Sequence, residues 1–150
     1  MDVIRREGDY AVRIMQVLSA AEGYCPTSRL AAETGVSIDH VRKIMPALSR
    51  AGLVQSRRGV NGGFQLARAA GEISLREIVD TVQGPLSMHL CLRKIIECPM
   101  AEGCRFRSLL RDWQDDLNRK LESVRLSDLL ACSERSLDGR QDPGLETRGS

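Results

Sequence analysis

Apolar residues recur at steps of three and four positions in several stretches of the chain, a spacing typical of amphipathic helices. The first stretch predicts a helix over residues 9–21. A short second helix is expected over residues 29–34, where Thr27 or Ser28 can cap its start. Gly35 is placed to end it, because glycine readily adopts the left-handed conformation that follows many helices.

A third helix is expected from Ser37, whose side chain can cap it, to about residue 51. Pro46 lies inside this helix and lacks the N–H that would bond the carbonyl of Arg42, so a kink or break is expected there. Two short helices joined by a glycine-containing turn are typical of a helix-turn-helix. The predicted apolar face of the third helix consists of Ile38, Val41, Ile44, Met45 and Leu48.

Two short strands are predicted directly after this motif, LVQSRR at 53–58 and GFQL at 63–66. The intervening GVNG favours a tight turn, since glycine and asparagine adopt turn conformations easily. Arg57 and Arg58 make the hairpin basic at its tip. A basic hairpin behind a helix-turn-helix is interpreted as a wing.

Two further helices follow the hairpin. Residues 74–84 begin with a capping box formed by Ser74 and Glu77. Residues 105–124 predict a long helix with one apolar side that carries the only tryptophan of the chain. Such a face needs a cover, and a two-fold partner is the simplest one, so we predict a dimerisation helix. Its apolar residues are Phe106, Leu109, Leu110, Trp113, Leu117, Leu121 and Val124.

The patterns together predict a mainly α-helical fold: a winged helix-turn-helix domain with a two-stranded wing, plus a long C-terminal dimerisation helix. Residues 1–84 are assigned to the DNA-binding domain, 85–104 to a cysteine-containing loop and 105–132 to the dimerisation helix region. Residues 133–150 are polar and without periodicity, so a disordered tail is expected there.

Composition narrows the class of protein further. The chain has 150 residues, 42% hydrophobic but only 3% aromatic, so its core must be mostly aliphatic. The charged N-terminus lacks the apolar segment of a secretory signal, and no stretch reaches the roughly 18 apolar residues of a membrane span. We therefore expect a cytoplasmic protein with reduced thiols. No catalytic constellation is recognisable, so we do not expect an enzyme.

The exposed side of the third helix is polar near its N-terminal end, the end that helix-turn-helix proteins present to base edges. Arg57 and Arg58 flank a glycine-rich turn and could enter a minor groove, where arginine is favoured. The alternative is a solvated polar face, and the net charge of +2 does not decide between them. The predicted DNA-binding residues are Ser37, Asp39, His40, Arg42, Lys43, Arg57 and Arg58.

Three segments together resemble one protein family: GDYAVRIM, TSRLAAETGVSIDHVRKIMPALSRAGLV and RRGVNGGFQLAR. They are similar to the bacterial winged-helix regulators typified by IscR, NsrR and RirA, over roughly residues 5–130. The resemblance implies a homodimer that binds a double-stranded DNA operator and regulates transcription, with repression as the expected mode.

Members of that family typically place three cysteines between the fourth helix and the dimerisation helix, where they bind an iron–sulfur cluster. Cys91, Cys98 and Cys104 fall in that place, so the resemblance implies a 2Fe-2S or 4Fe-4S cluster. Spacing alone does not, because gaps of six and five residues match neither zinc ribbons nor ferredoxins. Inert thiols, zinc ligands and a redox switch stay open as alternatives.

Three thiolates leave one ligand position open. The resemblance points to a histidine three residues after the last cysteine in IscR, but here Arg107 stands there and cannot serve. In NsrR-like proteins a carboxylate near the start of the first helix of the partner subunit completes the site, and Asp9 matches that place. An aspartate at a predicted helix start is equally typical of an N-cap. His89, two residues before Cys91, is the second candidate.

The sequence thus predicts a sequence-specific transcriptional regulator whose operator binding depends on a cluster that senses nitric oxide, redox state or iron. Cluster loss or nitrosylation is expected to reorganise the cysteine loop and move the two wings of the dimer relative to each other. One alternative is a regulator of the same fold without a cluster, responding through thiol oxidation or a partner. The other is a zinc-binding interaction scaffold.

Overall fold

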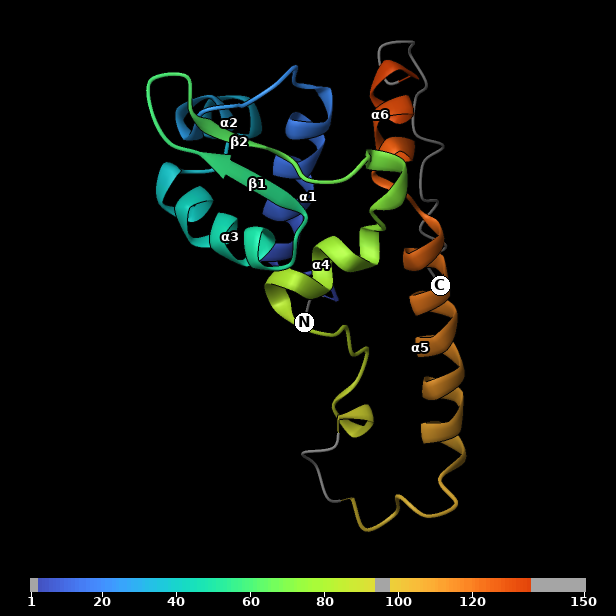
Figure 1. Ribbon diagram of the computed structural model, residues 1–150. Coiled ribbons are helices and arrows are strands. Elements are labelled where there is room, and N and C mark those ends of the chain that lie inside the picture. Colours follow the sequence, from blue (N-terminus) through green and yellow to red (C-terminus); the bar gives the residue numbers. More distant parts are fainter. Residues whose placement is uncertain (1–2, 94–97, 136–150) are drawn as a thin grey trace, which may run out of the picture.

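The computed structural model describes residues 3–93 and 98–135. Within these residues the chain forms six α-helices, two 3-10 turns and one antiparallel two-stranded sheet (Figure 1). The predicted winged helix-turn-helix with a long C-terminal helix is confirmed. The elements are α1 (Arg6–Ala20), α2 (Thr27–Thr34), α3 (Ile38–Arg50), β1 (Val54–Arg57), β2 (Gly63–Leu66), η1 (Ala70–Glu72), α4 (Leu75–Gln83), η2 (Leu90–Leu92), α5 (Arg105–Ser123) and α6 (Leu126–Arg135).

Helix α1 starts earlier than its apolar pattern predicts. Its N-cap position is Arg5, so Asp9 lies within the first helical turn and its interpretation as an N-cap is wrong. Long-range contacts hold the early start: the Arg5 N–H donates to Gln83 Oε1 at 2.8 Å, and Gln83 Nε2 donates to the carbonyl of Val3 at 3.0 Å. The spacing of apolar residues within the helix cannot predict such contacts, because they join residues far apart in the sequence.

Helix α2 begins at Thr27, and Pro26 occupies its N-cap position. Neither Thr27 nor Ser28 therefore caps the helix, because both already lie inside it. Proline suits a helix start, where a missing N–H leaves nothing unpaired. Gly35 ends α2 in the left-handed conformation with φ of 70°, as predicted.

Helix α3 is the second helix of the helix-turn-helix. Ser37 caps it as predicted, by accepting a hydrogen bond from the backbone N–H of His40. The helix runs through Pro46 as one element, so the expected break does not occur. Met45 and Leu48 on either side of the proline are buried, and this packing offsets the lost backbone hydrogen bond.

The wing pairs β1 with β2 in a register that runs from Val54 opposite Leu66 to Arg57 opposite Gly63. Cys25 extends the pairing, because its backbone exchanges two hydrogen bonds with Phe64, at 2.7 and 2.9 Å. Gly63 has a φ of 140°, and a Cβ there would lie 2.2 Å from the Cys25 carbonyl oxygen. Only glycine fits at this position, so the base of the wing is fixed against the chain before α2.

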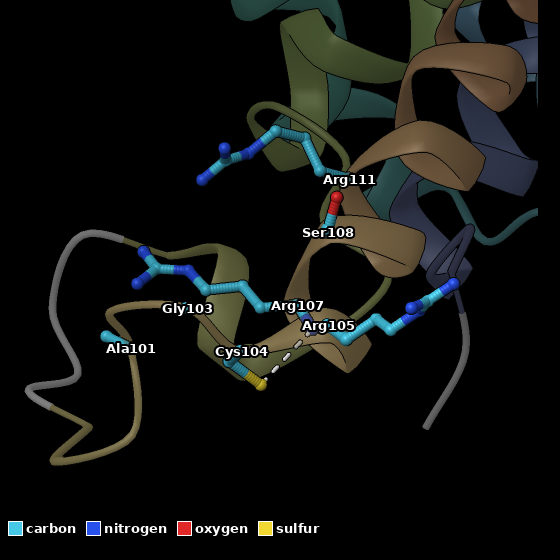
Figure 2. A pocket seen from close by; sticks show the side chains of 7 residues that line it. All are labelled: Ala101, Gly103, Cys104, Arg105, Arg107, Ser108 and Arg111. Carbon is cyan, nitrogen blue, oxygen red and sulfur yellow. Dashed lines mark hydrogen bonds between the residues drawn. The ribbon is translucent and has the colours of Figure 1, made fainter.

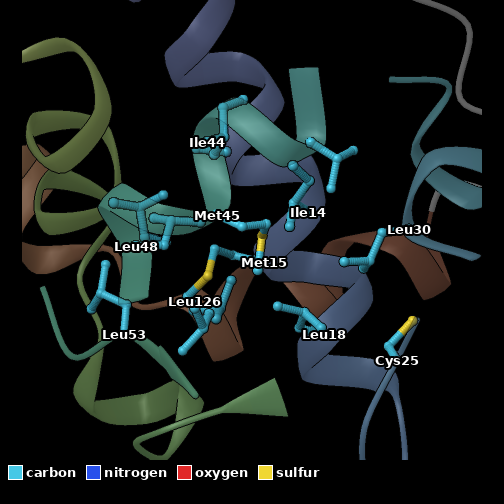
Figure 3. Close-up of a cluster of buried hydrophobic side chains, with 14 of the residues drawn as sticks. Ile14, Met15, Leu18, Cys25, Leu30, Ile44, Met45, Leu48, Leu53 and Leu126 are labelled. Carbon is cyan, nitrogen blue, oxygen red and sulfur yellow. The ribbon is translucent and has the colours of Figure 1, made fainter. Parts of the chain in front are cut away.

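One core joins the helix-turn-helix, the wing and the C-terminal helix (Figure 3). As the composition predicts, it is mostly aliphatic, and the few aromatic side chains lie at its edge or on the surface. Leu126 of α6 is completely buried in this core. Its other large, completely buried members include Ile14, Met15, Leu30, Met45, Leu48, Leu53, Ile73 and Ile78.

Helix α6 is not predicted by the sequence pattern. It packs against α1 and η1, so the residues that follow α5 return to the winged domain. Backbone hydrogen bonds from Leu75 to the Val124 carbonyl and from Leu126 to the Ile73 carbonyl fix the turn between α5 and α6 against the start of α4. The helix ends at Arg135, inside the stretch expected to be a tail, and residues 136–150 of that stretch lie outside the described residues.

The predicted capping box at the start of α4 forms only in part. Ser74 accepts from the N–H of Glu77 at 3.1 Å, but the Glu77 carboxylate pairs with Arg68. Helix α5 lies alongside α4 near its C-terminal end and extends away from the winged domain towards its N-terminal end (Figure 1). The described part of the cysteine segment lies at that far end, next to the start of α5.

Candidate functional site

The N-terminal end of α3 gathers most of the predicted DNA-binding residues on one exposed surface. Asp39, Arg42 and Lys43 are exposed, and Arg42 Nη1 lies 4.0 Å from the Asp39 carboxylate. Both side chains of this pair are more than two-thirds exposed, at 71% and 85%, so the ion pair leaves the Arg42 guanidinium accessible. The first two turns of α3 therefore present the Arg42 guanidinium, the Lys43 ammonium group and free backbone N–H groups of the helix start to the solvent.

His40 is held more tightly than its neighbours. Its Nδ1 lies 2.8 Å from the hydroxyl oxygen of Ser37, and its ring packs edge-to-face against Tyr10 of α1 with centroids 5.3 Å apart. The ring is half-buried by these contacts. His40 thus orients the start of α3 against α1, a role that the polar-face argument does not reveal.

The two wing arginines differ in their surroundings. Arg57 is anchored: its guanidinium lies 4.2 Å from the centre of the Tyr24 ring, and Nη2 donates to the Asn61 carbonyl at 2.8 Å. Arg58 is exposed and takes part in none of the ion pairs between described residues. Val60, at the tip of the same turn, is fully exposed. The wing therefore offers Arg58 as its free cation.

A cavity of about 260 Å³ is lined by residues of α2, α3 and the wing, which shows that α3 and the hairpin border one surface region. It lies beside Arg42 and Phe64. The residues that line it are Thr27, Arg42, Met45, Pro46, Ser49, Ser56 and Phe64. The helix end and the hairpin are thus positioned as parts of a single candidate DNA interface.

Cys91 and His89 lie together in the turn η2. His89 Nδ1 is 3.0 Å from Cys91 Sγ and 3.2 Å from the Cys91 backbone nitrogen, whose N–H it accepts. The His89 ring also packs edge-to-face against Phe106 of α5, with centroids 6.1 Å apart. These contacts place the Cys91 turn beside the first turn of α5.

Cys104 is the N-cap residue of α5, where its sulfur accepts a hydrogen bond from the Arg107 N–H at 3.4 Å. A hollow of about 480 Å³ opens beside it (Figure 2). Three arginines line the hollow without any carboxylate, and none of the three forms an ion pair with a described residue. Arg107 Nε is buried and has no hydrogen-bond partner among the residues that the structure describes. The lining residues are Ala101, Gly103, Cys104, Arg105, Arg107, Ser108 and Arg111.

The structure does not gather all the predicted cluster ligands. Cys98 is exposed in the loop, while Asp9 forms an ion pair with Arg13 at 2.7 Å on the first turns of α1. Among the described side chains of residues 3–93 and 98–130, no three cysteine, histidine or acidic groups lie close enough together to hold a metal ion. The types of side chain present still fit an iron–sulfur cluster. Three thiols and an imidazole are suitable ligands, and the guanidinium of Arg107 could donate a hydrogen bond to the anionic cluster.

Cys25 is distinct from the other described cysteines because it is completely buried under the wing. Burial raises the pKa of the Cys25 thiol, and nearby Arg29 lowers it only in part.

Sequence reasoning missed Tyr10 and Tyr24, which position His40 and Arg57. Their rarity was the available signal, because only two tyrosines occur in the chain.

The helix-turn-helix, the anchored wing and the polar end of α3 define a winged-helix DNA-binding regulator. The model of the Rrf2 family, described as iron-dependent transcriptional regulators, matches residues 4–132. The chain therefore belongs to the Rrf2 family. Within the part of the chain that the structure describes, no helix is long and apolar enough to cross a membrane.

Individual relatives agree with this assignment. The chain is 32% identical over 129 residues to protein aau3 of Rhizobium meliloti, covering 85% of this chain and 84% of that protein. It is 30% identical over 139 residues to the transcriptional regulator IscR of Photorhabdus laumondii, covering 91% and 84%. The named regulators among its relatives confirm the expectation that the chain is not an enzyme.

Two solved structures of CymR superimpose on the chain. The global cysteine regulator CymR of B. subtilis matches with a TM-score of 0.75 and 28% identity, covering 88% of this chain and 98% of that one. The oxidised form of Staphylococcus aureus CymR matches with a TM-score of 0.70 and 26% identity, covering 87% and 96%. The fold is thus shared with a protein described as a global cysteine regulator, although the family as a whole is described as iron-dependent.

Proposed function

We propose that this Rrf2-family regulator is a homodimeric repressor of a two-fold-related DNA operator, and that an iron–sulfur cluster on Cys91, Cys98 and Cys104 controls its binding. The observation that carries the cluster is the cationic hollow at Cys104 (Figure 2). An anionic group bound there would partner the buried Arg107 Nε and neutralise the surrounding guanidinium charge.

On DNA, the proposed contacts divide by kind. Ser37 and the free N–H groups of the α3 end bind a phosphate, while Arg42 and Lys43 reach base edges in the major groove. Asp39 lies 4.0 Å from the Arg42 guanidinium and leaves it accessible to the bases. Arg58 enters the neighbouring minor groove, and Arg57 holds the wing in shape through Tyr24.

The dimer follows from the surface of α5. Leu110 and Leu121 of the predicted apolar stripe are buried within the chain, whereas Phe106, Leu109 and Trp113 are 56%, 44% and 50% exposed. Dimerisation is typical of this family, and a second copy would cover these side chains. A two-fold axis along α5 would present the two recognition helices at half-sites about 34 Å apart.

The cysteine site is connected to that dimer surface through the chain itself. Cys104 both contributes a proposed ligand and caps α5, and Phe106 follows it in the first helical turn. When bound, the cluster supplies redox-active iron. Ligation by Cys104 would engage the sulfur that caps α5, so the state of the site alters the end of the helix on which the two protomers meet.

A second function has its own support. CymR of Staphylococcus aureus, which is similar to this chain, has been crystallised in an oxidised form. Cys98 of this chain is exposed, so an oxidant in solution could reach it. In this alternative the same DNA-binding surface responds to oxidation of the loop thiols without iron. The two functions share the fold and differ only in what the cysteines hold.

Iron and acid-labile sulfide measured on protein purified without oxygen, together with the visible spectrum, test the cluster. We expect iron and sulfide in matching amounts and a charge-transfer band in the wild type. Cys104→Ser should lose both but keep α5, because serine caps helices well. Cys132→Ser, outside the loop, is the matched control. A colourless wild type that also resists reconstitution would favour the thiol function.

The DNA surface is tested separately, with a duplex selected from a random pool by the wild-type protein. Arg42→Ala should weaken binding to that duplex by about 1–3 kcal/mol and affect random DNA much less. Arg119→Ala on α5, where Arg119 pairs with Asp116, is the control of equal charge change. Equal losses for both variants would remove Arg42 from base recognition.

A further inference from the structure

His89 is the one imidazole that the structure brings to the cysteine site. Its Nδ1 faces Cys91 Sγ at 3.0 Å, and its ring touches Phe106 in the first turn of α5. The same side chain therefore contacts the turn that carries Cys91 and the helix end that is capped by Cys104. The chain contains only one other histidine, His40, which contacts Ser37 and Tyr10 in the winged domain.

We propose that His89 supplies the fourth ligand of the cluster, in place of Asp9. The inference rests on the proposed function, since it assigns a residue to that same site. Imidazole nitrogen is an established partner of thiolates on the irons of 2Fe-2S clusters. To bind one iron, His89 Nδ1 would exchange the hydrogen bond that it accepts from the Cys91 N–H for the metal, and the two donor atoms, now 3.0 Å apart, would separate to about 3.5 Å.

Asp9 is less suited within the described structure. Its carboxylate pairs with Arg13 at 2.7 Å, and both side chains are about half exposed, at 48% and 50%. Ligation by Asp9 would also require the site to be completed from another protomer. His89 instead sits two residues from Cys91 in the same turn, so a single chain provides three thiols and one imidazole.

The contact between His89 and Phe106 would link the proposed ligand to the exposed apolar face of α5. An imidazole bound to iron has a fixed orientation, and its ring packs on the first apolar residue of the exposed α5 face. His89 then joins the cluster to the dimer surface independently of Cys104. Release of the cluster would remove the iron that fixes the His89 ring, so that the ring would be held only by its contacts with Cys91 and Phe106.

Pulsed electron paramagnetic resonance on the reduced protein tests this assignment directly. Labelling with ¹⁵N-histidine marks two residues only, so a nitrogen coupled strongly to the cluster must come from His89 or His40. We expect the coupling in the wild type and in the control His40→Gln. His89→Cys should lose it and keep a cluster with four thiolates, whose reduction potential is lower.

The outcomes separate the two proposals. A wild-type cluster without a histidine nitrogen coupling, or with one that survives in His89→Cys, overturns the assignment of His89 while the cluster stands. Loss of the cluster in Asp9→Ala, with no histidine coupling in the wild type, would return the fourth position to Asp9. A wild type that binds no iron after anaerobic reconstitution overturns the cluster and the His89 ligand together.

Discussion

The ring of Tyr10 in α1 packs edge-to-face against the ring of His40 in α3, with centroids 5.3 Å apart. His40 in turn lies 2.8 Å from the hydroxyl of Ser37, the residue that caps α3. A shift of α1 would therefore move the N-terminal end of α3, which we propose contacts DNA. A displacement of α1 would reach base contacts without any change in the residues that make them.

Replacing Tyr10 by leucine should weaken operator binding although Tyr10 does not touch DNA. An edge-to-face aromatic pair contributes about 0.5–1.5 kcal/mol, so the expected loss in affinity is roughly 2- to 12-fold. Tyr10→Phe keeps the ring and should bind like the wild type. Fluorescence anisotropy with operator and random duplexes measures both, and equal affinities for Leu and Phe would contradict the proposed coupling.

The two wing arginines should respond differently to truncation. Arg58→Ala should lower the affinity for DNA and reduce the dependence of log K on log salt by about one unit, as expected for one lost phosphate-region contact. Arg57→Ala should instead lower the stability of the wing, because the cation–π contact with Tyr24 contributes about 0.5–1 kcal/mol. Salt titrations and thermal melts distinguish the effects, and a changed melt for Arg58→Ala alone would reverse the assignment.

Cys25 should be the slowest of the described cysteines to react with iodoacetamide in the folded apoprotein. Burial raises the pKa of its thiol, so less thiolate is present at a given pH, and the side chain has no exposed surface. Cys98, which is exposed, should be modified first. Mass spectrometry of peptides from protein labelled near pH 8, with and without denaturant, checks this order. Early labelling of Cys25 would indicate that the wing opens from the core.

The sequence predicts most of this fold because its helices are amphipathic and its turns carry glycine. The early start of α1 could not be predicted, since it depends on Gln83, far away in the chain. Helix α6 was missed for a similar reason: its stability comes from burying Leu126 against α1, and its own sequence is short and bordered by polar residues.

The site divides in the same way. The exposed residues of α3 follow from helical periodicity, but the roles of His40 and Arg57 depend on tyrosines from other elements. The contact between His89 and Cys91 is local, yet spacing in a loop does not give side-chain direction. The arginine hollow combines a loop with two turns of α5, and only the folded chain shows that Arg107 Nε lacks a partner there.

Trp113→Glu should convert the protein into a monomer and weaken operator binding. The indole is half exposed beside Leu109 on α5, and a carboxylate at that place would be buried without a partner in a two-fold interface. The monomer should remain folded, because Leu110 and Leu121 provide the contacts of α5 with its own chain. Circular dichroism checks the fold, and sedimentation equilibrium gives the mass.

Asp115→Ala, an exposed position of the same helix, is the matched control and should leave the dimer intact. A monomer that holds only one half-site loses the gain from simultaneous binding, so its affinity for a full operator should fall to that for a single half-site. A dimeric Trp113→Glu protein would move the interface away from this face of α5. The proposed connection from Cys104 and His89 to the spacing of the recognition helices would then lose its basis.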